Sequence, residues 1–355
     1  MKKSNKKWAI ILVVVMSVAA IGVALKMMPI GSFGSNNKLN KISFSEIQIC
    51  NLEFDEGEKN NINQVLSMLY TENEKYAGFA NQSSQTIDLY KAEYYLKLAD
   101  LKSTVFGVLL STYTDYEINT EKINQYVDQT YEAIDSLESG YEQSQSLYYA
   151  IILDQLLNGY EKSYDVTFIQ NQIDRILNEM DYEENLMADI VSTRRLVEIV
   201  SDLQLFDADV SLSNKQIKKI KKGMQSGLKE DFIRESVVMN DIFVVDNILS
   251  FGLISDEEML SCYQLLSDDG GNKSVNSDDV IPDLLTTFQF VSSLEQLNNY
   301  EYLEQQKKFV SSLKLGDGIF SLDNTTEEAE DLTAIVYGNA IEQLELGGDA
   351  IDKAY

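Results

Sequence analysis

The 355-residue chain contains no histidine, and this absence excludes several kinds of chemistry. Without an imidazole there can be no Ser-His-Asp or Cys-His nucleophile, no His-ligated zinc and no histidine proton shuttle. Any acid–base chemistry must therefore use carboxylates, lysine or tyrosine.

Proline, cysteine and tryptophan are also scarce. Of the two prolines, Pro282 lies just before a predicted helix, where its missing N–H is tolerated. The two cysteines, Cys50 and Cys262, could form one disulfide in an oxidising compartment or remain two thiols. The single tryptophan, Trp8, lies in a hydrophobic N-terminal segment, so the rest of the chain lacks the side chain best suited to stacking on sugar rings.

Basic residues are few relative to acidic ones. The chain has 29 lysines and arginines against 57 aspartates and glutamates, a formal net charge of −28. A field of this sign repels nucleic acid and anionic lipid, and it attracts cations or basic partners. We therefore expect no nucleic-acid binding, and a basic peptide or protein is a reasonable partner. The acidity would also keep an exported domain soluble.

The N-terminus combines lysines with an uncharged segment. Residues 1–7 include four lysines, the segment Trp8–Leu25 carries no charge, and Lys26 follows. Such a segment can span a bilayer, and the lysine asymmetry favours a cytoplasmic N-terminus. We predict a cytoplasmic basic tip at 1–7, a transmembrane anchor at 8–28 and an extracytoplasmic remainder. The small residues Gly22-Val23-Ala24 leave a cleaved signal, and hence a secreted protein, as the alternative.

Helix starts recur through the rest of the chain, after a linker or strap at residues 29–57. Five read Asp followed by Leu or Ile and one reads Ser-Leu, and their mean spacing is about 49 residues, a period typical of stacked supersecondary units. An Asp or Ser there can accept hydrogen bonds from the first helical turn. The starts are Asp88, Ser146, Asp189, Asp241, Asp283 and Asp331.

Two kinds of helix alternate after these starts. Apolar segments long enough for buried helices are Leu89–Leu98, Leu147–Leu157, Ile190–Leu203, Ile242–Leu253, Leu284–Leu297 and Leu332–Leu344. Segments with a single apolar stripe are Glu58–Tyr70, Glu121–Ile134, Val166–Leu177, Asn214–Met224, Asp256–Leu266 and Glu301–Leu313. The alternation predicts an all-α domain at residues 58–355. Its six helical hairpins would close as an (α/α)6 toroid with the buried helices inside.

Two stretches share a more specific arrangement. In each stretch, a short segment that contains Gly and ends in Phe is followed by a polar loop. A predicted helix that begins with Asp-Leu and contains Tyr and Ala comes next. The first is Gly78-Phe79 followed by Asp88–Leu96, and the second is Asp317–Phe320 followed by Asp331–Tyr337. This arrangement resembles the repeat of terpenoid cyclases and protein prenyltransferases, and the resemblance implies the α/α toroid fold.

The catalytic signatures of that superfamily are missing. The nearest stretch to its Asp-x-Asp-Asp acid is Asp207–Val210, which lacks the last Asp. The zinc of the prenyltransferases needs a histidine, and neither cysteine belongs to the Cys-Gly-Glu-Gln thioester motif of complement-like toroids. The resemblance therefore implies the fold without these activities.

The Asp residues at the helix starts are the first candidate site. In parallel inner helices they would lie at one end of the toroid, as cavity-rim candidates: Asp88, Asp189, Asp241, Asp283 and Asp331. Paired carboxylates suit glycoside hydrolysis and clustered ones suit Ca²⁺, whereas helix capping alone also explains each. The loop Asp268–Asn272 resembles calcium loops in composition only. We expect no cofactor, with Ca²⁺ as the alternative.

Cavity-lining candidates fall on the predicted inner helices: Glu93, Tyr94, Tyr95, Tyr148, Tyr149, Arg194, Arg195 and Tyr337. The tyrosines either fill the interior or line a pocket. Adjacent helix positions diverge by about 100°, so both arginines cannot face inward. One should pair with Glu93, Asp189 or an anionic ligand, because an unpaired buried charge is costly.

A basic cluster on a predicted outer helix forms either a solvated face or a contact with anionic lipid or a cell-envelope polymer. Its members are Lys215, Lys218, Lys219, Lys221 and Lys222. We expect a membrane-anchored extracytoplasmic binding or scaffold module without catalysis. The alternative is a carboxylate-dependent enzyme acting on glycans or another polymer. A close acidic pair in a solvent-open cleft would favour the enzyme, and a tyrosine-filled interior would favour the scaffold.

Overall fold

The computed structural model describes residues 52–81, 99–158, 165–261, 268–297, 299, 301–326 and 331–344. The chain divides into the units Met1–Asn40 and Lys41–Tyr355, and every described residue belongs to the second unit. Within these ranges, no helix has the length and hydropathy needed to cross a membrane. Several predictions concern residues outside the described ranges: the basic tip, the segment 8–28, Cys50, Cys262, Asp88, Glu93, Tyr94 and Tyr95.

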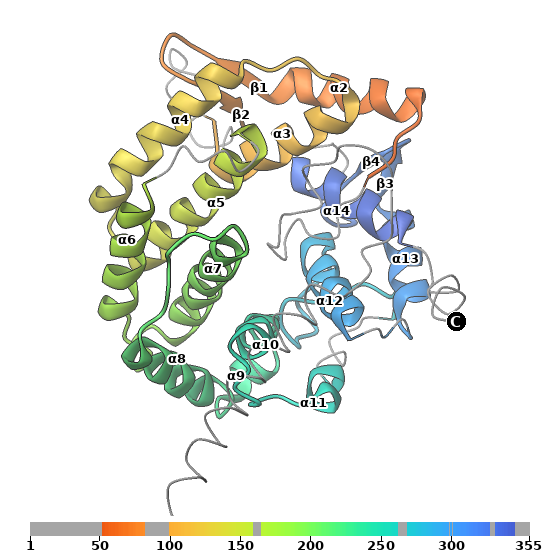
Figure 1. The fold of residues 1–355 in the computed structure, drawn as a ribbon. Helices are drawn as coiled ribbons and strands as arrows, with labels where there is room; N and C mark the ends of the chain where they lie inside the picture. The colour runs from red at the N-terminus through yellow and green to blue at the C-terminus, as the bar shows by residue number, and fades with distance from the viewer. Residues whose placement is uncertain are drawn as a thin grey trace, which may run out of the picture. The chain divides into compact units, whose positions relative to one another are not determined.

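The described residues are mainly helical, which confirms the predicted all-α class (Figure 1). A first set of helices comprises α3 Leu101–Thr114, α5 Gly140–Asn158, α7 Leu186–Leu205, α10 Val238–Leu249, α12 Leu284–Gln296 and α14 Leu332–Gln343. A second set comprises α2 Glu56–Leu69, α4 Thr120–Ala133, α6 Val166–Glu179, α8 Asn214–Gly227, α11 Asp256–Ser261 and α13 Leu303–Ser312. The short elements are η3 Ile134–Ser136, α9 Asp231–Arg234, β1 Tyr70–Glu72, β2 Ala77–Phe79, β3 Lys314–Gly316 and β4 Ile319–Phe320.

The two sets differ in burial as predicted. In α5 every residue from Leu147 to Gln155 is buried, so this helix is covered on all sides. In α6 the buried apolar residues Ile169, Ile173 and Ile176 follow the helical period and leave the opposite face polar. The alternation of buried and amphipathic helices is therefore confirmed for the described residues.

Each helix of the first set packs against the next. Contacts run from α3 to α5, α7, α10, α12 and α14, and α14 contacts α3, so the series returns to its first member. In Figure 1 the helices of the second set lie outside this series, with α2 against α3, α4 and α6 against α5, and α8 against α7. Where α14 meets its neighbours, Tyr337 stacks on Phe288 of α12, with ring centroids 3.6 Å apart, and meets the edge of Phe106 of α3 at 5.3 Å.

The first and last described residues are also joined by hydrogen bonds. The backbone N–H of Glu53 donates to Oε1 of Gln343 at 2.9 Å, and Nε2 of Gln343 donates to the carbonyl of Glu53 at 2.8 Å. Asn61 of α2 donates to the carbonyl of Asp317, in the turn between β3 and β4. The first and last of the described segments therefore lie side by side.

Two predicted helix starts are confirmed, and three are wrong. Asp283 and Asp331 cap α12 and α14 by accepting hydrogen bonds from the first helical turn. The helices assigned to Ser146, Asp189 and Asp241 begin earlier, at Gly140, Leu186 and Val238. The prediction placed each start at the first apolar residue of a buried run. The preceding residues, although more polar in α5, are already helical.

The helix α3 was not predicted from the sequence. The predicted inner helix Leu89–Leu98 lies outside the described residues, and α3 occupies the position before α5 in the series of contacts. Its cap, Asp100, accepts a hydrogen bond from Ser103 N at 2.7 Å. Asp100-Leu101 has the same Asp-Leu form as the other starts and could have been recognised by it.

The outer helices α2, α4, α6, α8 and α13 lie within a few residues of their predicted positions. The helix α2 begins at Glu56, inside the predicted linker, because Asp55 and Glu58 form a capping box at its start. The helix α11 is shorter within the described residues than the predicted segment Asp256–Leu266, which continues beyond them.

Two β-hairpins follow α2 and α13, at the two stretches that carry the family resemblance. Their second strands end with Phe79 and Phe320, which are fully buried. Each ring lies against a glycine of the following inner helix. A Cβ added at Gly107 would come 2.2 Å from the ring of Phe79, and one at Gly338 would come 2.4 Å from the ring of Phe320. The same aromatic-on-glycine contact is thus used twice.

A second repeated contact fixes the start of an inner helix. The N–H of Asp100 donates to the carbonyl of Phe79 at 2.9 Å, while Oγ1 of Thr104 accepts from the N–H of Phe79 at 3.0 Å. The start of α12 repeats both bonds, with Asn272 in place of Phe79 and Thr287 in place of Thr104. At the starts of both α3 and α12, two hydrogen bonds therefore hold the preceding segment of the chain against the first turn of the helix.

We expect Gly107→Ala and Gly338→Ala to lower the free energy of unfolding by about 1–3 kcal/mol, because each added methyl group would overlap a buried ring. Chemical denaturation measures the change. Gly316→Ala is the matched control, since nothing lies within 4 Å of a Cβ there. The close packing would be disproved if all three variants were equally stable, or if adding Phe320→Leu to Gly338→Ala recovered no stability.

Candidate functional site

A buried ion pair lies between α7 and α10. Arg194 is 2% exposed, and its Nη1 donates to Oδ1 of Asp241 at 2.7 Å. Its Nε lies 3.6 Å from Oε2 of Glu198, one turn further along α7. One of the two arginines thus pairs with a carboxylate, as predicted, but the partner is Asp241 rather than Asp189, and Glu93 lies outside the described residues. Asp241 and Glu198 take that role because α10 packs directly on this face of α7.

Arg195 points toward α5. Its guanidinium carbon lies 4.3 Å from the ring centroid of Tyr148 and 5.6 Å from that of Tyr149, distances typical of cation–π contacts. The two arginines diverge, yet both are buried, because α7 lies between α5 and α10. Each of the two arginine side chains is therefore covered by a neighbouring helix.

Further polar groups extend this interior cluster along α7. Nε2 of Gln155, on α5, donates to Oδ2 of Asp202 at 2.5 Å. Arg194, Glu198 and Asp202 follow one another at four-residue intervals, so they lie along one face of the helix. We call Gln155, Arg194, Glu198, Asp202 and Asp241 the central charged cluster. Gln155, Glu198 and Asp202 were not predicted from the sequence, although the charged residues at helical spacing in an apolar segment were an available signal.

The described cavity-rim candidates have separate roles. Asp241 pairs with Arg194, and Asp283 and Asp331 cap helices. Asp189 lies in the first turn of α7, where burial raises the pKa of its carboxyl group. Burial likewise raises the pKa of Asp241, against the opposing effect of Arg194. Among the described residues, no hydrogen bond joins two of these carboxylates.

The described cavity-lining tyrosines are packed in the interior. Tyr148 is fully buried, and Tyr149 and Tyr337 are nearly so. Tyr148 and Tyr149 meet edge to face at 5.3 Å, and Tyr337 stacks on Phe288. Their rings therefore fill space between inner helices.

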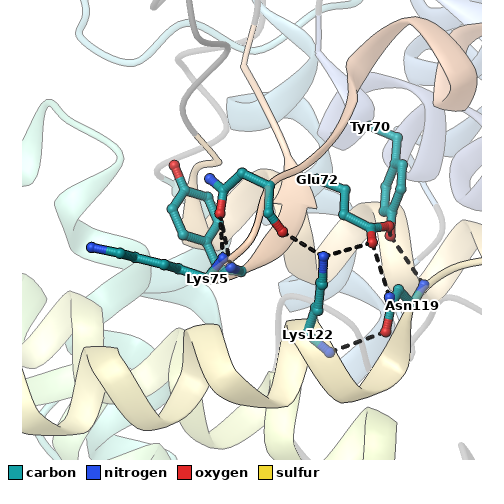
Figure 2. Close-up of polar contacts among 7 residues, drawn as sticks. Tyr70, Glu72, Lys75, Asn119 and Lys122 are labelled. Carbon is teal, nitrogen blue, oxygen red and sulfur yellow. Dashed lines mark hydrogen bonds and ion pairs between the residues drawn. The ribbon is translucent and has the colours of Figure 1, made fainter.

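A second polar cluster lies at the surface, between the first hairpin and α4 (Figure 2). Oε1 of Glu72 accepts from Nζ of Lys122 and Nδ2 of Asn119, both at 3.0 Å, and Oε2 accepts from the hydroxyl of Tyr70 at 3.1 Å. These bonds, led by that of Lys122, lower the pKa of Glu72. Lys122 also donates to the carbonyl of Asn73. The cluster binds the hairpin to the start of α4, which Asn119 caps.

An open groove of about 690 Å³ lies at the start of α7. It is lined by residues 182–188, by Ser226 near the end of α8, and by Glu230 and Phe232 at α9. Phe232 is 51% exposed and Met187 is 44% exposed. We call this feature the α7 groove. The groove was not predicted from the sequence, because only tertiary packing brings α8 and α9 beside the start of α7.

The basic cluster on α8 is only partly a solvated face. Nζ of Lys219 donates to the carbonyls of Leu177 and Asn178 at the end of α6. Lys221 donates to the carbonyl of Phe251, whereas Lys215, Lys218 and Lys222 are exposed. Two of the five lysines therefore hold neighbouring segments in place.

The described residues contain no group of three or more carboxylate or cysteine side chains placed to hold a metal ion. In the loop Asp268–Asn272, Gly270 lies against the backbone of Gln305, and the buried side chain of Asn272 accepts from Gln306 at 2.9 Å. These contacts pack the loop on α13. Calcium binding there stays a prediction.

Comparisons with protein-family models, curated proteins and solved structures found no match to this chain.

We expect Arg194→Met and Asp241→Asn each to lower the free energy of unfolding by about 3–5 kcal/mol, because each leaves a buried charge without its main partner. The double variant Arg194→Met/Asp241→Asn should lose less than the sum of the two. Lys222→Met is the control, because it breaks an exposed pair with Glu183 and should change little. Additive losses in the double variant would contradict direct coupling.

Stability should fall as the pH rises from 5 to 7.5. Burial raises the pKa of Asp189, Asp283 and Glu295, so the folded state binds more protons than the unfolded state above the ordinary carboxyl pKa of about 4. The free energy of unfolding then decreases with pH. Thermal melts at high salt, which screens surface repulsion, should keep this trend. Asp283→Asn, which retains a capping side chain, should flatten it; a rise in stability over this range would contradict the assignment.

Proposed function

We propose that this protein is a non-catalytic binding or scaffold module on the extracytoplasmic side of a membrane. It would be anchored by residues 8–28 and built on an α/α toroid similar to that of terpenoid cyclases and prenyltransferases. One contrast carries the proposal. The interior charges are buried in mutual contacts, whereas the α7 groove presents apolar and acidic side chains to solvent.

The toroid is supported by the order of helix contacts. Buried and amphipathic helices alternate along the chain, and the contacts between buried helices return from α14 to α3. Two contacts each occur twice, as a repeated unit predicts: the packing of a Phe ring on a helix glycine, and the pair of hydrogen bonds that holds the preceding segment at a helix start. These features favour six hairpins around a common interior.

The absence of catalysis is supported by the state of the carboxylates. A general acid or base must reach the proton that it transfers. Asp241 is bound to Arg194, and Asp283 and Asp331 accept bonds from helix N–H groups. Tyr148 and Tyr337 fill the adjoining interior. The alternative, a carboxylate-dependent enzyme on glycans, would need such a pair open to substrate.

The membrane location rests on the sequence. Lysines precede the uncharged segment Trp8–Leu25, and the long acidic remainder suits an exported domain. Secretion after signal cleavage is the alternative. The sedimentation of the full-length chain with membranes distinguishes the two.

Thermal unfolding of the full-length protein, recovered from the membrane fraction, tests the proposal. We expect at least one of a panel of cell-wall glycans, isoprenoid diphosphates, basic peptides and divalent cations to raise the midpoint saturably. A ligand at about 100 times its Kd adds about 2.7 kcal/mol to the free energy of unfolding. The ligand should be recovered unchanged. Conversion of a glycan would support the enzyme instead, and recovery of the chain only from the medium would contradict the anchor.

A further inference from the structure

We propose that the α7 groove binds a basic polypeptide segment that carries a bulky apolar side chain. This inference rests on the proposed binding function and assigns its partner. Three kinds of group meet in the groove: exposed apolar side chains, carboxylates and the first-turn N–H groups of a helix. A polypeptide of this composition complements all three.

The apolar side chains come from two different elements. Met187 lies in the first turn of α7 and Phe232 on α9, and both line the groove with a large exposed fraction. Single exposed apolar residues are ordinary, but two that line the same groove offer a place where another side chain can be buried. Methionine adapts to the shape of its partner, so the pair suits a bulky aliphatic or aromatic anchor.

The carboxylates of the groove give it its charge preference. Glu183, Glu184 and Glu230 line it and are exposed. Glu183 lies 3.6 Å from Lys222, an exposed pair that constrains it little. With a chain of formal net charge −28, the groove will attract lysine and arginine side chains and repel acidic ones.

The helix start supplies hydrogen-bond donors. Asn185 is the N-cap of α7, but its side chain makes no capping bond, so it leaves the first-turn N–H groups of α7 to other acceptors. Peptide carbonyls are suitable acceptors at such a position. A polyamine and a metal ion both lack hydrogen-bond acceptors for the helix N–H groups, and both lack an apolar side chain. Nucleic acid is repelled by the negative charge of the groove. A basic polypeptide is therefore the occupant that the groove favours.

Tyr182, which lines the groove, is packed against both α7 and α8. The ring of Tyr182 lies against Gly223 of α8, where an added Cβ would come within 2.6 Å of it. The hydroxyl groups of Tyr182 and Thr193 are 2.5 Å apart. The segment before α7 is thus fixed to both α7 and α8. A volume of about 690 Å³ lies within the range of about 300–1,000 Å³ for ligand sites and suits a few residues of peptide.

Fluorescence anisotropy with the full-length protein tests the inference. The probe is a labelled seven-residue peptide with a central phenylalanine between lysine pairs, and the comparison peptides replace phenylalanine by serine or lysine by glutamate. We expect saturable binding of the probe, at least tenfold weaker binding of the serine peptide and none of the glutamate peptide. Failure of the basic peptide to bind would overturn the inference, whereas a saturable shift with another ligand of the panel would still support a binding module.

Variants locate the binding. Phe232→Ser and the pair Glu184→Lys/Glu230→Lys should each weaken the probe at least tenfold, with unchanged thermal melts because these side chains are exposed. Matched controls are Leu205→Ser, at an exposed apolar residue outside the groove, and Glu132→Lys/Glu138→Lys, which changes the net charge equally elsewhere. Both controls should change the affinity less than twofold. Equal losses in groove and control variants would show general attraction to an acidic surface and overturn the groove as the site.

Discussion

Arg194 is buried where α7 packs on α10, and its charge must be balanced from within the protein. Removing a guanidinium from water is costly unless carboxylates surround it at hydrogen-bonding distance. Asp241 of α10 accepts a hydrogen bond from this guanidinium, and Glu198 of α7 adds a second negative charge 3.6 Å from its Nε. The pair thereby fixes the rotation of α7 and its register against α10. Arg195, one residue on, is then directed onto the tyrosines of α5. Helices, interior cluster and groove depend on this one orientation of α7.

Polar side chains in the interior and at the surface differ in what they contact. Inside, acidic groups are held by arginine, glutamine and helix N–H groups, and aromatic rings occupy the remaining space. At the start of α7 the same kinds of group face solvent, because the short α9 brings Phe232 and Glu230 beside Met187. This difference is the reason that we propose binding at the surface rather than in the interior.

The sequence predicted those features that depend on neighbouring residues. The spacing of apolar residues correctly predicted that α5 is a buried helix and α6 an amphipathic one. A helix buried on all sides has apolar residues at most positions, whereas a helix buried on one face has them only at helical spacing. Capping predicted the starts at Asp283 and Asp331. It failed at Asp189 and Asp241, where the carboxylate lies within the helix, and an aspartate that pairs with a buried arginine looks the same in sequence as one that caps. Of the central charged cluster, Arg194 and Asp241 were predicted as candidates but not as partners. The α7 groove had no local signal, since residues about 40 positions apart form it.

The contact between Glu53 and Gln343 joins positions separated by 290 residues. Contacts of such long range form late, because the loop between them must close first. A ribosome releases α3 long before α14, so Phe106 lacks the ring of Tyr337 through most of synthesis. The first helices would therefore stay only partly packed until the last has been made. The last helix of the described residues, α14, would then complete the packing of α3 and commit this unit to its native state.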